Sequence, residues 1–201
     1  MAGAERYSAV AVFLHWLMAL ALVGMLAAGF YMGGMDNSDS NKFVLYQLHK
    51  SFGFTILALA LFRLGWRLAH PVPPLPAEMP ALEKIAARAA HWAFYGLMIG
   101  MPLVGWLGVS SSPMKIPTRI FGLFILPHLP FFHGDPNPGQ TTRELFEWHE
   151  YMAYALIALL ILHIAAALKH HFINKDSVLL AMMPAAFSRA LKNMRGQHDE
   201  I

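Results

Sequence analysis

Residues 148–172 read WHEYMAYALIALLILHIAAALKHHF, an apolar stretch with histidines near both ends. The stretch is longer than the roughly 20 residues that an α-helix needs to cross a hydrocarbon core of about 30 Å. His149 and His163 are 14 residues apart. At 100° per residue, this spacing puts both side chains on the same helix face, about 21 Å apart along the axis. One helix is therefore predicted to present two imidazoles to the interior of a bundle, one in each leaflet.

Three further apolar stretches precede this one, and the expected spans cover residues 8–35, 43–68, 86–109 and 145–172. Each span must be helical because lipid offers no partner to open backbone groups. The whole sequence is 57% hydrophobic and 13% charged, whereas soluble domains contain about 25% charged residues. The sequence therefore predicts an all-α integral membrane four-helix bundle, forming a single domain over residues 1–201.

The basic residues are divided unevenly between the two sides of this bundle. Ten of the 15 lysines and arginines fall on the side that holds both termini. By the positive-inside rule, both termini are expected in the cytoplasm of a bacterial cell, with the bundle in its inner membrane. The basic residues form no stripe with interleaved aromatics, so we expect no nucleic-acid partner.

The histidines within the spans carry the functional argument. The chain contains no cysteine, which excludes disulfides, iron–sulfur clusters, thiolate-bound metals and covalently attached c-type haem. Ionisable residues are costly inside a membrane, so each one there is a candidate for function. Five histidines meet this condition: His15, His49, His91, His149 and His163.

Depth in the membrane pairs four of these histidines. His15 lies near the cytoplasmic end of the first span, level with His163 in the last span, and His49 lies in the second turn of the second span, level with His149. We expect the pairs His15/His163 and His49/His149 to bind the irons of two b haems. Bis-histidine ligation leaves no open position on iron, so it suits electron transfer. Apart from the haems, no catalytic group is expected.

Other residues at these depths have more than one reading. Arg63, Arg67 and Lys50 are candidate partners of haem propionates, although arginines at a helix end also snorkel to the interface. His91 lies at the depth of the inner haem, where it could pack, contact a propionate or contact a quinone. Gly29 and Gly105 would leave room where the face of a haem presses on a helix, or would simply permit close helix packing.

Several motifs together resemble those of the bacterial cytochrome b561 family. They are RYSAVAVFLHW around His15, LHKSFGFTILALALFRLGWRL from Leu48, AHWAFYGLMIGMPLVGW around His91, and the last span from Trp148. The resemblance covers nearly the whole chain. It implies a dihaem b cytochrome of the inner membrane that exchanges electrons with the quinone pool, with the same four histidines as ligands. Some members are similar to superoxide oxidase, which oxidises superoxide at the outer face and reduces ubiquinone.

Three functions remain open at this stage. The first is a superoxide:quinone oxidoreductase. The second is a cytochrome b subunit that anchors or serves a partner oxidoreductase or a periplasmic cytochrome. The third is a haem-free transporter or proton channel that uses the histidines as a relay. Expected partners are lipid, the quinone pool, and superoxide or a redox protein, and a homodimer stays open. In the long outer loop, residues 110–142, the patch FGLFILPHLPFF (121–132) is expected to lie on the membrane surface as a lid.

Overall fold

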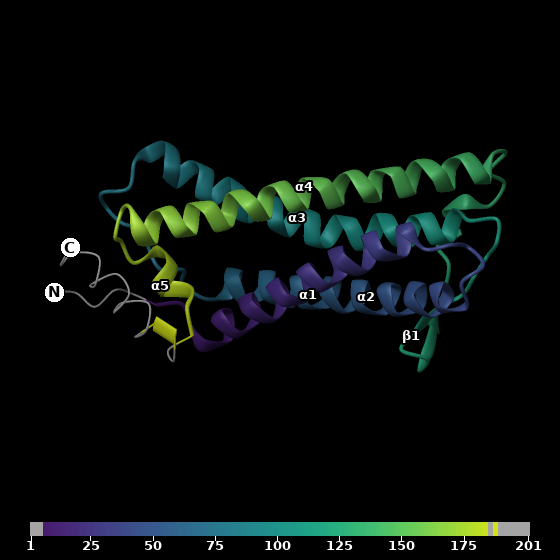
Figure 1. Cartoon of the computed structure of the whole chain (residues 1–201), viewed down its shortest axis with the longest axis horizontal. Coiled ribbons are helices and arrows are strands. Elements are labelled where there is room, and N and C mark those ends of the chain that lie inside the picture. Colours follow the sequence, from purple (N-terminus) through teal and green to yellow (C-terminus); the bar gives the residue numbers. More distant parts are fainter. Residues whose placement is uncertain (1–5, 185–186, 189–201) are drawn as a thin grey trace.

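The computed structural model describes residues 6–184 and 187–188 and contains four long helices. They are α1 (Ala9–Gly34), α2 (Ser40–Ala69), α3 (Ala81–Ser111) and α4 (Pro138–Phe172). The helices run side by side as an elongated bundle (Figure 1). Each is long and apolar enough to cross a membrane. The predicted all-α, four-helix membrane architecture is confirmed, while the side that each end faces stays a prediction.

Local signals explain where the helices begin. The Ser8 hydroxyl accepts a hydrogen bond from the Ala11 N–H, and the Asp39 carboxylate accepts one from the Asn41 N–H, so both residues cap free N–H groups of a first turn. Pro138 occupies the first turn of α4, where its missing N–H costs nothing. Helices α2, α3 and α4 begin before their predicted spans because their first turns contain polar residues, which lower the hydropathy there.

The bundle has two distinct ends. We call the end with the α1–α2 turn and the 112–137 loop the hairpin end, and the opposite end the terminal end. At the terminal end, the short helix α5 (Val178–Met182) folds back onto the start of α1. The Trp16 indole N–H donates to the Met182 carbonyl at 2.8 Å, and the Lys169 ammonium pairs with Glu83 of α3 at 2.6 Å. These contacts tie the helix ends together.

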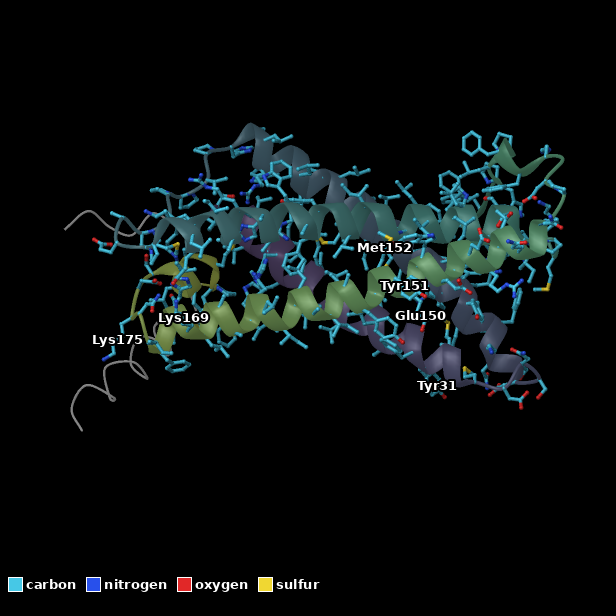
Figure 2. The ribbon with its side chains drawn as sticks, turned by 90° about the horizontal axis from the view of Figure 1, so that it is seen from above. Tyr31, Glu150, Tyr151, Met152, Lys169 and Lys175 are labelled. Atoms are coloured by element: carbon cyan, nitrogen blue, oxygen red, sulfur yellow. The ribbon has the colours of Figure 1, made fainter. Side chains whose placement is uncertain are left out.

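The helices do not pack equally against one another. Helix α4 lies along α3 over much of its length, and α1 lies along α2, whereas α4 has few backbone contacts with α1 or α2. Figure 2 shows Glu150, Tyr151 and Met152 on the half of α4 near the hairpin end and Lys169 toward the terminal end. The Met152 methyl group is 3.0 Å from the position that a Cβ on Gly100 of α3 would take. Small residues thus allow α3 and α4 to approach closely.

The buried core is small and lies at mid-height in the bundle. Its members come from all four long helices: Met18, Leu22, Ile56, Ala60, Tyr95, Met98 and Leu156. Many other large apolar side chains, such as Leu20, Phe62 and Leu162, are exposed on the outer surface. A soluble protein rarely exposes so much apolar surface, so this distribution agrees with lipid as the surrounding solvent.

The loop at the hairpin end contains two short strands that the sequence analysis did not predict. Strands β1 (Thr118–Ile120) and β2 (Phe124–Leu126) pair antiparallel, and a short 3₁₀ helix, η1 (Pro130–Phe132), follows. Phe121 and Gly122 between the strands have φ angles of 47° and 75°, the left-handed conformations that tight hairpin turns require. The hairpin projects sideways from the bundle (Figure 1).

We expect Gly108→Ala to destabilise the bundle by about 1–3 kcal/mol, the usual cost of overpacking. A Cβ on Gly108 would lie 2.9 Å from the Phe146 ring, whereas one on Gly96 of the same helix would meet nothing within 4 Å. Thermal unfolding in detergent should show a lower midpoint for Gly108→Ala. The matched variant Gly96→Ala should leave the midpoint unchanged or raise it, because alanine is the better helix former. Equal midpoints for the two variants would contradict the close packing of α3 on α4.

Candidate functional site: two histidine pairs inside the bundle

At the terminal end, helices α1 and α4 bring His15 and His163 together. The centroids of the two rings are 6.1 Å apart, with 56° between the ring planes. At the hairpin end, α2 and α4 bring His49 and His149 to 6.2 Å, with 65° between the planes. The four histidines therefore form two facing pairs, and α4 contributes one member to each.

The separation within each pair fits two imidazoles bound to one metal. A metal–nitrogen bond of about 2 Å on each side, with about 1 Å from nitrogen to ring centre, puts the two centroids about 6 Å apart. At this separation the facing nitrogens are too distant for a good direct hydrogen bond. Among the described residues, no group of three or more His, Asp or Glu side chains is arranged to hold a metal ion. Haem fits this arrangement because its porphyrin supplies four nitrogen ligands and needs only two from the protein.

The surroundings of the hairpin-end pair fix the orientation of one ring. The His149 Nδ1–H donates to the Met101 carbonyl of α3 at 3.0 Å, which leaves the Nε2 lone pair free, as in many metal-binding histidines. The His49 Nδ1 is buried and has no hydrogen-bond partner. The two rings also lie against glycines. A Cβ on Gly29 would be 3.6 Å from His49, and one on Gly105 would be 3.2 Å from His149.

At the terminal end, a third histidine approaches the pair. The His91 ring of α3 is 6.0 Å from the His163 ring, so ring distance alone does not separate His91 from His15 as the partner of His163. Helix packing does. Because α3 lies directly along α4 while α1 stays apart from it, a macrocycle between the rings fits the α1–α4 pair better. His91 then lies beside the site rather than opposite His163.

Two arginines surround this end of the site without a carboxylate partner. The Arg63 Nη2 lies 3.2 Å from the His15 Nδ1, and its guanidinium is 5.9 Å from the centre of the Tyr95 ring. Arg67 hydrogen-bonds Tyr7; burial raises the pKa of that phenol, and Arg67 acts in the opposite direction. Among residues 6–184 and 187–188, neither arginine is within ion-pair distance of an acidic group. Partly buried guanidinium groups that lack a carboxylate partner are well placed to bind an anion.

Lys50, a predicted propionate partner, contacts the loop in this structure, and its role at a propionate stays a prediction. Its ammonium donates to the Pro117 carbonyl of the loop at 3.2 Å, so it attaches α2 to the loop. The Met101 carbonyl was missed by the sequence analysis because every residue has such a group. Pro102 of α3 was no signal for it either, since a proline frees the carbonyl four residues earlier, that of Met98.

A membrane-spanning four-helix bundle with two such histidine pairs has the architecture of a membrane-bound b-type cytochrome. Sequence similarity to known proteins supports the same class. The family model for prokaryotic cytochrome b561 matches residues 6–185. The chain is 33% identical over 180 residues to "Cytochrome b561 homolog 2" of Escherichia coli K12, covering 89% of this chain and 92% of that relative. It is 30% identical over 182 residues to "Probable superoxide oxidase CybB" of Yersinia pestis, covering 90% and 97%.

A third relative, "Cytochrome b561 homolog 1" of Escherichia coli K12, is 27% identical over 180 residues, which cover 90% of this chain and 98% of the relative. The chain belongs to the prokaryotic cytochrome b561 family. Membership in this family implies b-type haem binding, electron transfer and a place in a bacterial membrane.

We expect Gly105→Leu to disturb the haem bound near His149 and leave the terminal-end pair intact. A Cβ at this position already lies 3.2 Å from the His149 ring, so a larger side chain must displace the imidazole. Low-temperature reduced-minus-oxidised spectra of the purified protein should lose part of the b-haem absorbance. Gly96→Leu, on the same helix with open space around it, is the control and should keep the full spectrum. Identical spectra for both variants would argue against a ligand role for His149.

Proposed function

We propose that the chain holds two b haems, one in each histidine pair, and carries electrons across the membrane from superoxide to ubiquinone. The observation that supports this most directly is the pair of facing imidazoles at 6.1 and 6.2 Å on the two halves of one bundle. Both pairs share α4, where 14 residues separate the two histidines, about 21 Å along the helix axis. In this proposal the hairpin end faces the periplasm of a bacterial inner membrane, and both termini face the cytoplasm.

The residues of the chain bind and insulate rather than react. Haem, when bound, supplies reversible one-electron chemistry. Histidine on both faces of each iron would leave no position for oxygen to bind. Leu156 lies seven residues from each α4 histidine, and together with Met18 and Ala60 it is almost fully buried. These apolar side chains keep water out of the region between the two pairs.

The hairpin end carries charges of both signs, among them three lysines that a small anion could approach. Lys42, Lys50 and Lys115 donate to the carbonyl oxygens of Met35, Pro117 and Ser110, respectively. In the part of the chain that the structure describes, none of the three pairs with a carboxylate.

Several nearby carboxylates accept hydrogen bonds from uncharged groups. Asp36, Asp39 and Asp135 accept from the backbone N–H groups of Ser38, Asn41 and Asn137, respectively, and Glu150 accepts from the Tyr154 hydroxyl. Six acidic residues keep their negative charge and offset the five basic residues at this end: Asp36, Asp39, Asp135, Glu144, Glu147 and Glu150 against Lys42, Lys50, Lys115, Arg119 and Arg143. The support for an anionic donor is therefore local, from individual lysines, and not from a net positive field.

The stoichiometry of the proposed reaction follows from its electrons. Each superoxide gives up one electron and leaves as O₂. Ubiquinone takes two electrons and two protons to become ubiquinol, so two superoxide ions are consumed for each quinone.

Arg63, Arg67 and His91 cluster at the terminal end, and we assign the arginines to haem propionates and His91 to a propionate or quinone contact. The similarity to a protein named as a probable superoxide oxidase also supports this choice of donor.

The second candidate is a cytochrome b subunit that takes electrons from a partner oxidoreductase or a periplasmic cytochrome. The family name alone supports both candidates, because the relative that is 33% identical is named only as a cytochrome b561 homolog. A stable second subunit that co-purifies with the chain would favour this candidate. A homodimer is compatible with either candidate.

We expect the purified protein to contain two haems per chain and each of four single variants to contain one. The variants are His15→Ala, His49→Ala, His149→Ala and His163→Ala, since each removes one axial ligand of one site. His133→Ala, in the hairpin-end loop outside both pairs, is the control and should keep two haems. The pyridine haemochrome assay measures the ratio. Fewer than two haems in the unaltered protein, or two in any of the four variants, contradicts the assignment.

We expect superoxide generated by a radiolysis pulse to decay faster with the protein and ubiquinone present, and ubiquinol to form in step. In His149→Ala the added decay should collapse to the spontaneous dismutation rate, because the proposed entry site is lost. A rate that falls as ionic strength rises would indicate local attraction of the anion to the lysines, since salt screens such attraction. Quinol formation that survives in His149→Ala, or no acceleration at all in a fully haem-loaded protein, would favour the second candidate.

A further inference from the structure

The surface that the histidine pairs leave unexplained is the β-hairpin of the long loop. We propose that the hairpin tip, residues 121–125, inserts into the phospholipid leaflet at the hairpin end and anchors α2 at that depth. This role is separate from electron transfer. It rests on where the hairpin is attached, on the chemistry of its tip and on its continuity with the side of α2.

The hairpin is attached to the side of α2 that faces away from the histidine pair. The Ser51 hydroxyl, almost fully buried, accepts from the Phe121 N–H at 3.0 Å and lies 3.1 Å from the Arg119 carbonyl. The Gln47 side chain bonds the Arg119 N–H and the Pro117 carbonyl. His49 is two residues from both Gln47 and Ser51, which places it about 160–200° around the helix from them. The hairpin is therefore attached on the side of α2 opposite His49, and the predicted position of the patch at the membrane surface is the part of the sequence-based expectation developed here.

The tip of the hairpin is apolar and exposed. Leu123 is 81% exposed and Ile125 is 59% exposed, and Phe121 and Phe124 are also exposed. No charged residue occurs from residue 120 to residue 127. Water is a poor solvent for four adjacent side chains of this kind, and a contiguous apolar surface of this type marks an interaction site.

The tip continues the lipid-facing surface of the helix. The Phe121 ring meets the exposed Phe52 ring of α2 edge to face, with centroids 5.2 Å apart. Phe52 itself lies within a helix that is long and apolar enough to span the membrane. The hairpin also leaves the bundle sideways, beside α2 rather than along the bundle axis (Figure 1). A lipid that covers Phe52 would therefore also cover Phe121 and its neighbours.

The polar groups limit how deep the hairpin can lie. Strand β2 has no second strand neighbour among the described residues, and open backbone edges are not tolerated in the hydrocarbon region. Arg119 is exposed on β1, and the basic residues Lys50 and Lys115 lie nearby on α2 and the loop. Cationic side chains next to an apolar surface are typical of segments at the headgroup boundary. These observations favour a phospholipid interface over a protein partner.

The absence of cysteine from the chain allows the location to be measured directly. A nitroxide spin label on Leu123→Cys, in the haem-loaded protein in phospholipid nanodiscs, should collide more with oxygen than with a water-soluble nickel chelate. The lipid control is Phe62→Cys, which is exposed within the membrane span of α2. The water control is Asn37→Cys, which is exposed in the polar turn between α1 and α2. We expect the oxygen-to-nickel ratio at position 123 to approach that at position 62.

Two outcomes would overturn the proposal. A ratio like that of position 37 would place the tip in water. Low collision rates with both reagents would show that protein covers the tip, and spin–spin broadening would then identify a second copy of this chain. Full haem content in the labelled variant shows that the substitution has not unfolded the protein, so each result bears on the hairpin alone.

Discussion

An imidazole inside a membrane must satisfy two ring nitrogens where water supplies no partner. The chain meets this demand for His149 on one side, through the Met101 carbonyl at 3.0 Å. On the other side each ring faces another ring at 6.1 or 6.2 Å, too far for a good direct hydrogen bond between them. Each pair therefore has unsatisfied ring nitrogens, which cost free energy unless a metal ion between the two rings binds both. Haem iron would do so, since it can bind one imidazole on each face.

The unequal packing of the helices follows from the same requirement. Helix α4 provides one histidine of each pair and lies along α3, whereas α1 and α2, which provide the opposite histidines, remain apart from it. Close packing of all four helices would leave no room for a macrocycle between the rings. The buried core is accordingly confined to mid-height, around Met18 and Leu156. Glycine appears where a ring must lie against a helix, with Gly29 beside His49 and Gly105 beside His149.

Hydropathy and helical period predicted the four helices and the approach of His15 to His163 and of His49 to His149, because both follow from long regular segments. Haem ligation by these residues stays a prediction. Strands β1 and β2 were not predicted because each has only three residues, too few to show a periodic pattern in the sequence. The contact of Lys50 with the Pro117 carbonyl was not predicted either, because spacing along one helix does not reveal a tertiary contact with a loop.

The contact between Arg63 and His15 shows how binding of haem would rearrange the terminal end. A guanidinium only donates hydrogen bonds, so at 3.2 Å the His15 Nδ1 must accept, and its proton then resides on Nε2. Iron binding through Nε2 requires the opposite tautomer, with the proton on Nδ1. Arg63 must then find another acceptor, and the described residues offer no carboxylate to it or to Arg67. Two propionates from a haem at this level would supply the missing acceptors, so the same group that needs His15 also releases Arg63 from it.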